Sequence, residues 1–320
     1  MAATLTPDQR AVLNALTAEQ CGVVSRSQLL AAGLPGEFGS NRVAARRWRA
    51  VLDGVYLTHT GTIGFRERCW AALLHCGPGS ALARGTAAHL HGIERSPSTT
   101  IAVVVPHGRR IVAPPWIAVV RQRRPIAWGG QPARTTAEVT ALDLCDLTDD
   151  VDRVVGLVTA TARLQRGTAH LRRELARRRG VRHRGVLRDL LAEHGLESVL
   201  ENRFLRDVVG AHGLPRPVLQ RADTVEGRSI RSDAVVEEYG VRVELDGRIH
   251  ETRTDEDVWR DDWVAVDSGH LTLRLRWRHV LGRPCRSAAL VARALRRGGW
   301  TGNIGPCGPD CRAVDAAPSR

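Results

Sequence analysis

The chain has 320 residues and a formal net charge of +13, with 47 basic residues, all of them arginine, against 34 acidic ones. This charge favours a polyanionic partner such as nucleic acid, and 43% hydrophobic content supports the cores of two or three domains. No secretory signal precedes Leu5 and no apolar run reaches about 18 residues, so we expect a cytoplasmic protein with no membrane partner.

Residues 1–60 are predicted to begin with three short helices. Thr6 is a good N-cap for a first helix, and Ser25 is a good N-cap for a second helix that stops at Gly33. After a turn, a third helix is expected over residues 41–46. The caps and stops therefore indicate a small helical unit at the start of the chain.

A β-hairpin is predicted directly after these helices. Residues 48–52 and 55–58 flank Asp53-Gly54, which is a strong turn signal. Three helices and a hairpin are the element order of a winged helix-turn-helix. Four arginines gather on the third helix and the wing, where DNA phosphates would lie: Arg42, Arg46, Arg47 and Arg49. They are predicted to bind DNA, although a solvated arginine face on a generic helical domain would give the same pattern.

Five short segments of the first half carry a family resemblance. They are residues 22–33, 48–56, 71–79, 86–92 and 132–136. Together they resemble the N-terminal region of AbiEi-type antitoxins, the regulators of type IV toxin–antitoxin systems. The resemblance implies a DNA-binding regulator-like head, with a cognate toxin as a partner. Residues 61–182 are accordingly predicted to form a helical and mixed middle region that ends in a basic linker.

Residues 183–300 have the pattern of a small mixed α/β sheet. In chain order we expect a helix opened by Ser198, a strand over 218–222, a hairpin over 232–250, a helix over 255–267, a strand over 271–275 and a helix over 287–297. The predicted fold class is therefore α+β: a winged helix-turn-helix, a helical and mixed middle region, and a C-terminal sheet domain.

The predicted hairpin of residues 232–250 gathers acidic side chains. Strand alternation places Glu244 and Asp246 on one face, and Asp233 falls on the same face of the preceding strand. A turn at 239–240 sets Asp233 across from Asp246, whereas a turn at 238–239 sets it across from Glu244. An odd-length loop without a bulge would separate them. Because clustered carboxylates repel each other, the pattern predicts a hard cation such as Mg²⁺ or Mn²⁺.

A second resemblance rests on motifs that occur in order through the C-terminal part. They are residues 198–201, 213–220, Asp233, 244–250, 257–261 and 273–277. They resemble the domain of unknown function numbered 559, which is similar to very-short-patch repair endonucleases and the PD-(D/E)XK nuclease superfamily. The resemblance implies a restriction-endonuclease-like fold for residues 183–300 and metal binding by Asp233, Glu244 and Asp246. Asp246 stands where many superfamily members have lysine.

The same resemblance assigns supporting roles outside the hairpin strands. It implies a helix carboxylate at Glu201 that supports metal or water, and a catalytic histidine at His250. It also places Asp257 and Arg260 on the next helix, facing the site. The two could equally form an ordinary helix ion pair, because they are three residues apart.

Structural alternatives exist for the other site residues. With Ser198, Glu201 could form a capping box and merely close its helix. Asp233 and Glu244 could be exposed strand charges paired with neighbouring arginines. His250 could be a surface histidine after a turn.

Residues 301–320 are predicted to be a disordered tail. The seven cysteines are scattered and odd in number, which fits free thiols in a reducing compartment. Cys307 and Cys311 lie in this tail, and a metal site there would need further ligands that the sequence does not indicate.

The sequence thus favours a DNA-binding protein with a Mg²⁺-dependent endonuclease domain that hydrolyses DNA phosphodiesters. The alternative is a non-catalytic transcriptional regulator or antitoxin whose nuclease-like domain is degenerate. The sequence does not fix the oligomeric state.

Overall fold

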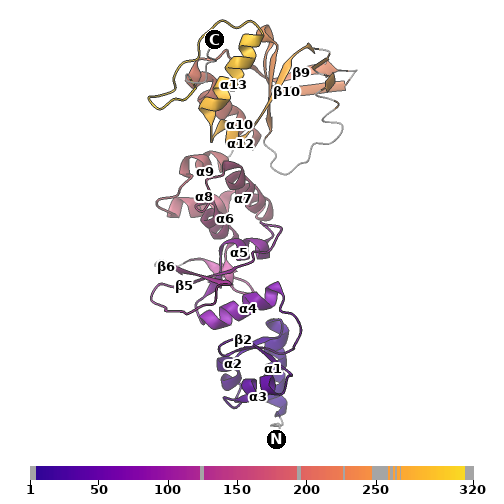
Figure 1. Cartoon of the computed structure of the whole chain (residues 1–320), viewed down its shortest axis with the longest axis vertical. Coiled ribbons are helices and arrows are strands. Elements are labelled where there is room, and N and C mark those ends of the chain that lie inside the picture. Colours follow the sequence, from indigo (N-terminus) through magenta and orange to yellow (C-terminus); the bar gives the residue numbers. More distant parts are fainter. Residues whose placement is uncertain are drawn as a thin grey trace. The chain divides into compact units, whose positions relative to one another are not determined.

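The computed structural model describes residues 5–122, 126–192, 196–225, 228–246, 259, 262–263, 265–266 and 268–313. The chain divides into two compact units, the first comprising Met1–Leu144 with Ala160–Glu174 and the second comprising Cys145–Thr159 with Leu175–Arg320. Helices and three β-sheets are present in the described residues, so the α+β class is confirmed (Figure 1). Within those residues, no helix combines the length and the apolar character that crossing a bilayer requires.

The first unit begins with three helices and a three-stranded sheet. The elements in chain order are α1 (Pro7–Glu19), β1 (Val23–Ser25), α2 (Arg26–Ala31), α3 (Phe38–Ala44), β2 (Arg49–Leu52) and β3 (Val55–Leu57), and the sheet order is β1-β3-β2. Capping boxes at Thr6 and Ser25 confirm the predicted starts of α1 and α2. The predicted start of α3 was wrong by three residues, because Phe38 is buried in the core and begins the helix.

A five-stranded sheet and further helices follow along the chain as far as residue 190. The strands are β4 (Ala81–Leu82), β5 (Ile101–Pro106), β6 (Ile117–Gln122), β7 (Trp128–Gly129) and β8 (Arg134–Thr135), in the order β6-β5-β4-β8-β7. The helices are α4 (Phe65–Cys76), α5 (Arg84–His91), α6 (Ala137–Cys145), α7 (Val151–Leu164), α8 (Ala169–Arg177) and α9 (Arg184–Leu190). The middle region is therefore mixed, with strands between its helices.

The second unit contains a four-stranded sheet in the order β12-β11-β10-β9. Its strands are β9 (Val218–Val225), β10 (Arg228–Val236), β11 (Val241–Asp246) and β12 (Leu271–Arg276). β11 and β12 are parallel, and the other neighbours are antiparallel. After α9, which also belongs to this unit, the helical elements of the described residues are α10 (Leu196–Arg203), η1 (Phe204–Val209), η2 (Gly210–His212), η3 (Glu237–Tyr239), α12 (Trp277–Val280) and α13 (Pro284–Arg297).

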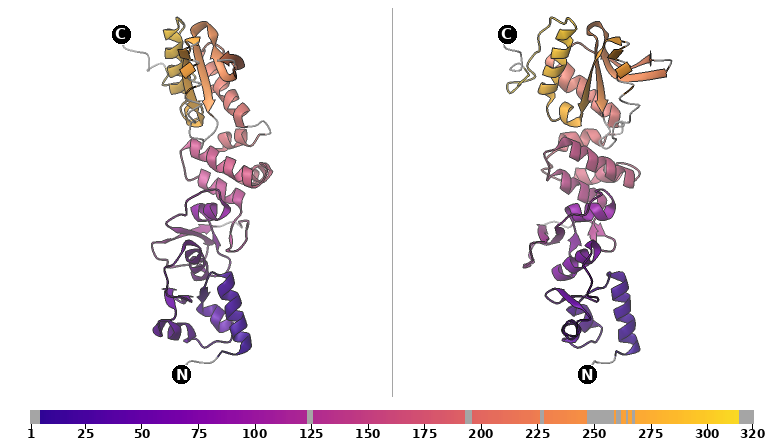
Figure 2. Two further views of the ribbon diagram at one scale, coloured as in Figure 1. Left: turned by 90° about the vertical axis from the view of Figure 1, so that its right-hand side faces the viewer. Right: turned by 45° about the vertical axis from the view of Figure 1, so that its right-hand side comes forward.

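Helices cover this sheet and complete its core. α13 contacts β12 and η1, and α10 contacts β11. Figure 2 shows α13, in yellow, beside the orange strands. Phe204, Trp277 and Leu295 are almost completely buried. The core therefore fixes the position of α10 relative to the strands that carry the acidic residues.

The hairpin between β10 and β11 has one of the two predicted registers. Ala234 pairs with Val243 and Val236 pairs with Val241, so continuing the register by one residue places Asp233 opposite Glu244. The connection is η3 followed by Gly240, whose φ of 59° is left-handed and suits glycine. The connection thus has an even number of residues and keeps both carboxylates on one face.

Part of the predicted disordered tail is ordered. The Gly305 N–H donates to the His212 carbonyl oxygen at 2.9 Å, and Ala313 is only 2% exposed. A backbone hydrogen bond and a buried side chain hold residues 301–313 against the second unit, although they form no regular element. The last seven residues of the predicted tail, 314–320, lie outside the described residues.

The substitution Gly298→Ala tests the packing that supports the hairpin connection. A methyl group at Gly298 would overlap the Tyr239 carbonyl, inside the connection that sets the register. We expect the free energy of unfolding to fall by about 1–3 kcal/mol, measured by urea unfolding with circular dichroism. The control is Gly185→Ala in α9, where nothing lies within 4 Å of an added Cβ, and it should not destabilise. Equal stability of Gly298→Ala and the wild type would contradict this packing.

Candidate functional site

Glu201, Gln220 and Asp233 come together from three separate elements of the second unit. They lie on α10, β9 and β10, respectively. The Gln220 side-chain amide donates a hydrogen bond to Glu201 Oε1 and another to Asp233 Oδ1, the latter at 3.3 Å. One amide group therefore bridges two carboxylates that would otherwise repel each other.

The backbone of Gln220 is unusual for a strand residue. Its φ is +50°, in the left-handed region that residues other than glycine rarely adopt. Next to it, the ladder pairs Ser232 with Arg221 and Ala234 with Leu219 but records no pair between Gln220 and Asp233. The backbone of β9 is thus distorted at the residue that forms the side-chain bridge. Backbone strain of this kind is found at functional sites.

Asp233 is also held from the side of β11. Its Oδ2 accepts the backbone N–H of Leu245 at 2.6 Å, which is a short, charge-assisted hydrogen bond. Leu245 lies between Glu244 and Asp246, so this bond fixes Asp233 beside both predicted metal ligands. The side chains of Asp233, Glu244 and Asp246 are half-buried. They are therefore partly shielded from solvent.

Asp246 is engaged by an arginine of the neighbouring strand. In the parallel register Glu244 pairs with Arg274 and Asp246 pairs with Arg276. Arg276 Nε lies 3.3 Å from Asp246 Oδ2, and the Arg276 side chain is 50% exposed. An ion pair this exposed contributes at most about 1 kcal/mol, so a cation of higher charge can displace the arginine.

The helix that carries Glu201 is anchored by charged contacts at its C-terminal end. Arg203 pairs with Asp189 of α9 and, at 2.8 Å, with Asp207 of η1. Burial alone would raise the pKa of Asp207, but hydrogen bonds from Arg206 and Arg203 outweigh it and lower that pKa. A lowered carboxyl pKa contributes stability at neutral pH, which is lost as the pH falls through the folded-state value.

Three further residues were predicted to complete the site. His250, Asp257 and Arg260 lie outside the described residues, so their roles remain predictions. In the described part of the site, Gln220 lies between the carboxylates of Glu201 and Asp233. Glu244 is opposite Asp233 in the hairpin register, and Asp246 lies beside Arg276.

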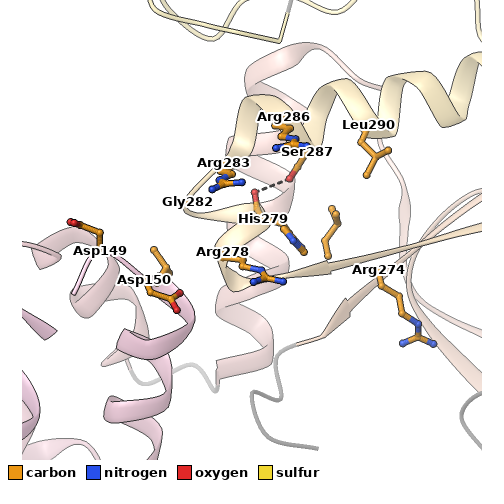
Figure 3. A pocket seen from close by; sticks show the side chains of 12 residues that line it. Asp149, Asp150, Arg274, Arg278, His279, Gly282, Arg283, Arg286, Ser287 and Leu290 are labelled. Carbon is orange, nitrogen blue, oxygen red and sulfur yellow. Dashed lines mark hydrogen bonds between the residues drawn. The ribbon is translucent and has the colours of Figure 1, made fainter. Parts of the chain in front are cut away.

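A basic pocket of about 760 Å³ lies in the same unit (Figure 3). It is lined by Asp149, Asp150, Val151, Arg274, Leu275, Arg278, His279, Gly282, Arg283, Arg286, Ser287 and Leu290. Burial lowers the pKa of His279 and the charge of Arg278 adds to this effect, so the positive charge at neutral pH comes from the arginines. Arg274 lines this pocket and lies opposite Glu244 in the β11–β12 register, so it adjoins both the basic and the acidic regions.

Of the four arginines predicted to bind DNA, Arg42 lies on α3 and Arg49 begins β2. Arg46 and Arg47 lie between these elements, because α3 ends at Ala44 and not at residue 46 as predicted. The Arg42 guanidinium lies over the Phe38 ring, 5.0 Å from its centroid, and is half-buried. Arg46, Arg47 and Arg49 are exposed. Within the described part of the chain, no carboxylate is recorded in an ion pair with any of these three. Their positive charge is therefore open to an external anion.

Some of these residues have only weak signals in the sequence. Gln220 ends a segment of the second resemblance, but an amide carries no charge pattern that would single it out. Arg274 lies on the predicted strand 271–275 and Arg276 follows it directly. Their position beside the carboxylates depends on the pairing of β11 with β12. His212 and Cys285 gave no local signal, because they are distant in sequence from each other and from Cys307 and Cys311.

Comparisons with known proteins identify no family. No protein-family model matches the chain, and no curated protein matches it. The solved structures that match include the crystal structure of the RV2827C protein from Mycobacterium tuberculosis, at 16% sequence identity and a TM-score of 0.35. That match covers 64% of this chain and 78% of the other. At this TM-score the similarity supports no conclusion about fold or function.

The substitution Gln220→Glu tests the bridge between Glu201 and Asp233. It replaces a donor with a third carboxylate at nearly constant volume, so repulsion should lower the free energy of unfolding by about 2 kcal/mol at pH 7. Urea unfolding measures the loss. The matched control is Asn202→Asp, which adds the same charge at an exposed position of α10 and should change stability by less than about 0.5 kcal/mol. Equal effects of the two substitutions would refute the bridge.

Proposed function

We propose that this protein binds DNA and hydrolyses its phosphodiester bonds with a Mg²⁺- or Mn²⁺-dependent, PD-(D/E)XK-like endonuclease domain in the second unit. The observation that carries the proposal is the convergence of Glu201, Gln220 and Asp233 from three elements, with Glu244 across the hairpin. The order of a helix, three antiparallel strands and a fourth strand parallel to the third gives further support.

The donor set suits a hard divalent cation. Asp233 and Glu244 would hold the ion through carboxylate oxygens. Asp246 would also bind the ion, after its ion pair with Arg276 is broken. When bound, the ion would offset the charge of a phosphodiester and acidify a water molecule. The Leu245 N–H donates to Oδ2 of Asp233 and the Gln220 amide donates to Oδ1, so the two bonds hold this carboxylate in one orientation. The half-buried carboxylates fit that role better than freely exposed strand charges would.

The protein's own groups would serve the reaction in three ways. Glu201, oriented by the Gln220 amide, would accept a proton from the attacking water, as would His250. Arg274 would offset phosphate charge beside Glu244, since the chain has no lysine for this purpose. The pocket arginines Arg278 and Arg283 would bind neighbouring phosphates of the DNA backbone.

The first unit would deliver the enzyme to duplex DNA. Its element order of helix, strand, two helices and a hairpin supports the assignment of residues 1–60 to a winged helix-turn-helix. Exposed Arg46, Arg47 and Arg49 would bind backbone phosphates, and Arg42 would add a further contact. Phosphate contacts position a protein on DNA without reading its sequence.

One observation favours a second function, that of a non-catalytic regulator or antitoxin. Asp246 stands where many nucleases of this superfamily have lysine, and it pairs with Arg276. In this alternative the first unit represses a promoter, the second unit is a degenerate scaffold, and a cognate toxin is the partner. DNA binding without cleavage in any divalent metal would favour this function.

The substitution Asp233→Asn tests the catalytic site. It keeps an oxygen that accepts from the Leu245 N–H but removes the charge, so cleavage with Mg²⁺ or Mn²⁺ should fall by at least about 100-fold. Plasmid nicking and linearisation are measured on gels. Glu238→Gln, which removes an exposed carboxylate from the same hairpin, should cut at the wild-type rate. Cleavage by Asp233→Asn at that rate would remove the proposed role.

The double substitution Arg46→Ala/Arg47→Ala tests the DNA-binding surface. It should weaken binding to duplexes of any sequence, and the slope of log Kobs against log salt should become shallower by roughly one unit per lost phosphate contact. Fluorescence anisotropy across a salt series measures both effects. Arg10→Ala, on the exposed surface of α1, is the control and should change neither. An unchanged slope in the double variant would place the DNA elsewhere.

A further inference from the structure

His212, Cys285, Cys307 and Cys311 form a cluster in the second unit. One ligand atom of each residue lies within 4.8 Å of the ligand atoms of the others. The sulfur atoms of Cys285 and Cys307 are 3.5 Å apart, and all the cysteines are free thiols. In tetrahedral zinc sites, Zn–S bonds of about 2.3 Å separate neighbouring sulfurs by roughly 3.7 Å. The cluster therefore has the ligand number and nearly the spacing of a zinc site.

His212 gives an independent indication of a bound ion. Its side chain is completely buried, and Nδ1 lies 3.1 Å from the Val208 carbonyl oxygen. Nε2 is also buried, with no hydrogen-bond partner among the described residues. A buried ring nitrogen without a partner is costly, and coordination would satisfy it. A carbonyl that accepts from Nδ1–H leaves the Nε2 lone pair free for a metal, as is usual for histidine ligands.

Three segments distant in the sequence build this cluster. Pro284 occupies the first turn of α13 and places Cys285 beside it. The Cys311 N–H donates to the Gly308 carbonyl oxygen at 3.1 Å, which folds the tail so that Cys307 and Cys311 approach each other. The hydrogen bond from the Gly305 N–H to the His212 carbonyl oxygen holds this turn against η2. The protein's own hydrogen bonds thus assemble the ligands.

The ligand types select the ion and its role. Three thiols and an imidazole favour zinc over Mg²⁺ or Mn²⁺, which prefer oxygen ligands. Four protein ligands leave no open position for substrate, as in structural rather than catalytic sites. His212 lies on the connection between α10 and β9, which carry Glu201 and Gln220. The ion would hold the tail, α13 and this connection together.

We propose that His212, Cys285, Cys307 and Cys311 bind one structural zinc ion per chain. The site shares no residue with the carboxylate cluster, so zinc binding does not depend on whether the protein has nuclease activity. Its loss would release residues 301–313 from the second unit and loosen the connection that precedes Gln220.

Metal content tests this site directly. The full-length protein, purified with reductant and without chelators, should contain one zinc per chain by inductively coupled plasma mass spectrometry. The double variant Cys307→Ser/Cys311→Ser should contain almost none, whereas Cys21→Ser, which removes a thiol in the other unit, should keep its zinc. A zinc-free wild type, or a double variant that retains wild-type zinc, would overturn the proposal.

A measurement on the wild type avoids variants that fail to fold. Burial raises the pKa of Cys69 and of Cys145 to about 12 and that of Cys76 to about 11, so these thiols should react slowly with Ellman's reagent. Removing zinc with a chelator should therefore expose three more fast-reacting thiols, those of Cys285, Cys307 and Cys311. Adding Co²⁺ should then produce the d–d absorption of a tetrahedral thiolate complex. An unchanged thiol count and no such absorption would contradict the assignment.

Discussion

The register between β10 and β11 determines where every acidic side chain of the hairpin lies. Side chains alternate along a strand, so a slip of one residue would turn Glu244 away from Asp233 and disperse the cluster. The connection through η3 and the left-handed Gly240 fixes this register, and α13 packs against η3. The Leu245 N–H then holds Asp233 in place. Glu201 depends on the same arrangement, because the Gln220 amide that orients it also binds Asp233.

The second unit keeps two kinds of ligand chemistry apart. Carboxylates gather on the hairpin beside arginines of β12, whereas thiols and a buried histidine gather where the tail meets η2 and α13. Oxygen donors suit Mg²⁺ and Mn²⁺, whereas thiolates suit Zn²⁺, so the two clusters favour different ions. The connection containing His212 joins α10 to β9, so a structural ion there would stabilise the elements that carry Glu201 and Gln220. Rigid support of this kind is what a catalytic arrangement of side chains requires.

Local signals in the sequence predicted the local features well. The caps at Thr6 and Ser25, the Asp53-Gly54 hairpin and the carboxylate hairpin all depend on neighbouring residues, and each is present. Features that depend on contacts between residues far apart in the sequence were not predicted. The Gln220 bridge needs three elements to meet, and the histidine and cysteine cluster needs residues from 212 to 311. The tail was predicted to be disordered from its glycine and proline content, but its order comes from contacts with η2 that composition does not reveal.

We expect the carboxylates of the β10–β11 hairpin to bind a divalent cation. Titration of the protein with Mn²⁺, followed by electron paramagnetic resonance of the free ion, measures this directly and requires no DNA. We expect one Mn²⁺ site per chain for which Mg²⁺ competes. This site should be lost in Asp233→Asn and retained in Cys307→Ser/Cys311→Ser. Equal Mn²⁺ binding by the wild type and Asp233→Asn, or no binding by either, would contradict it.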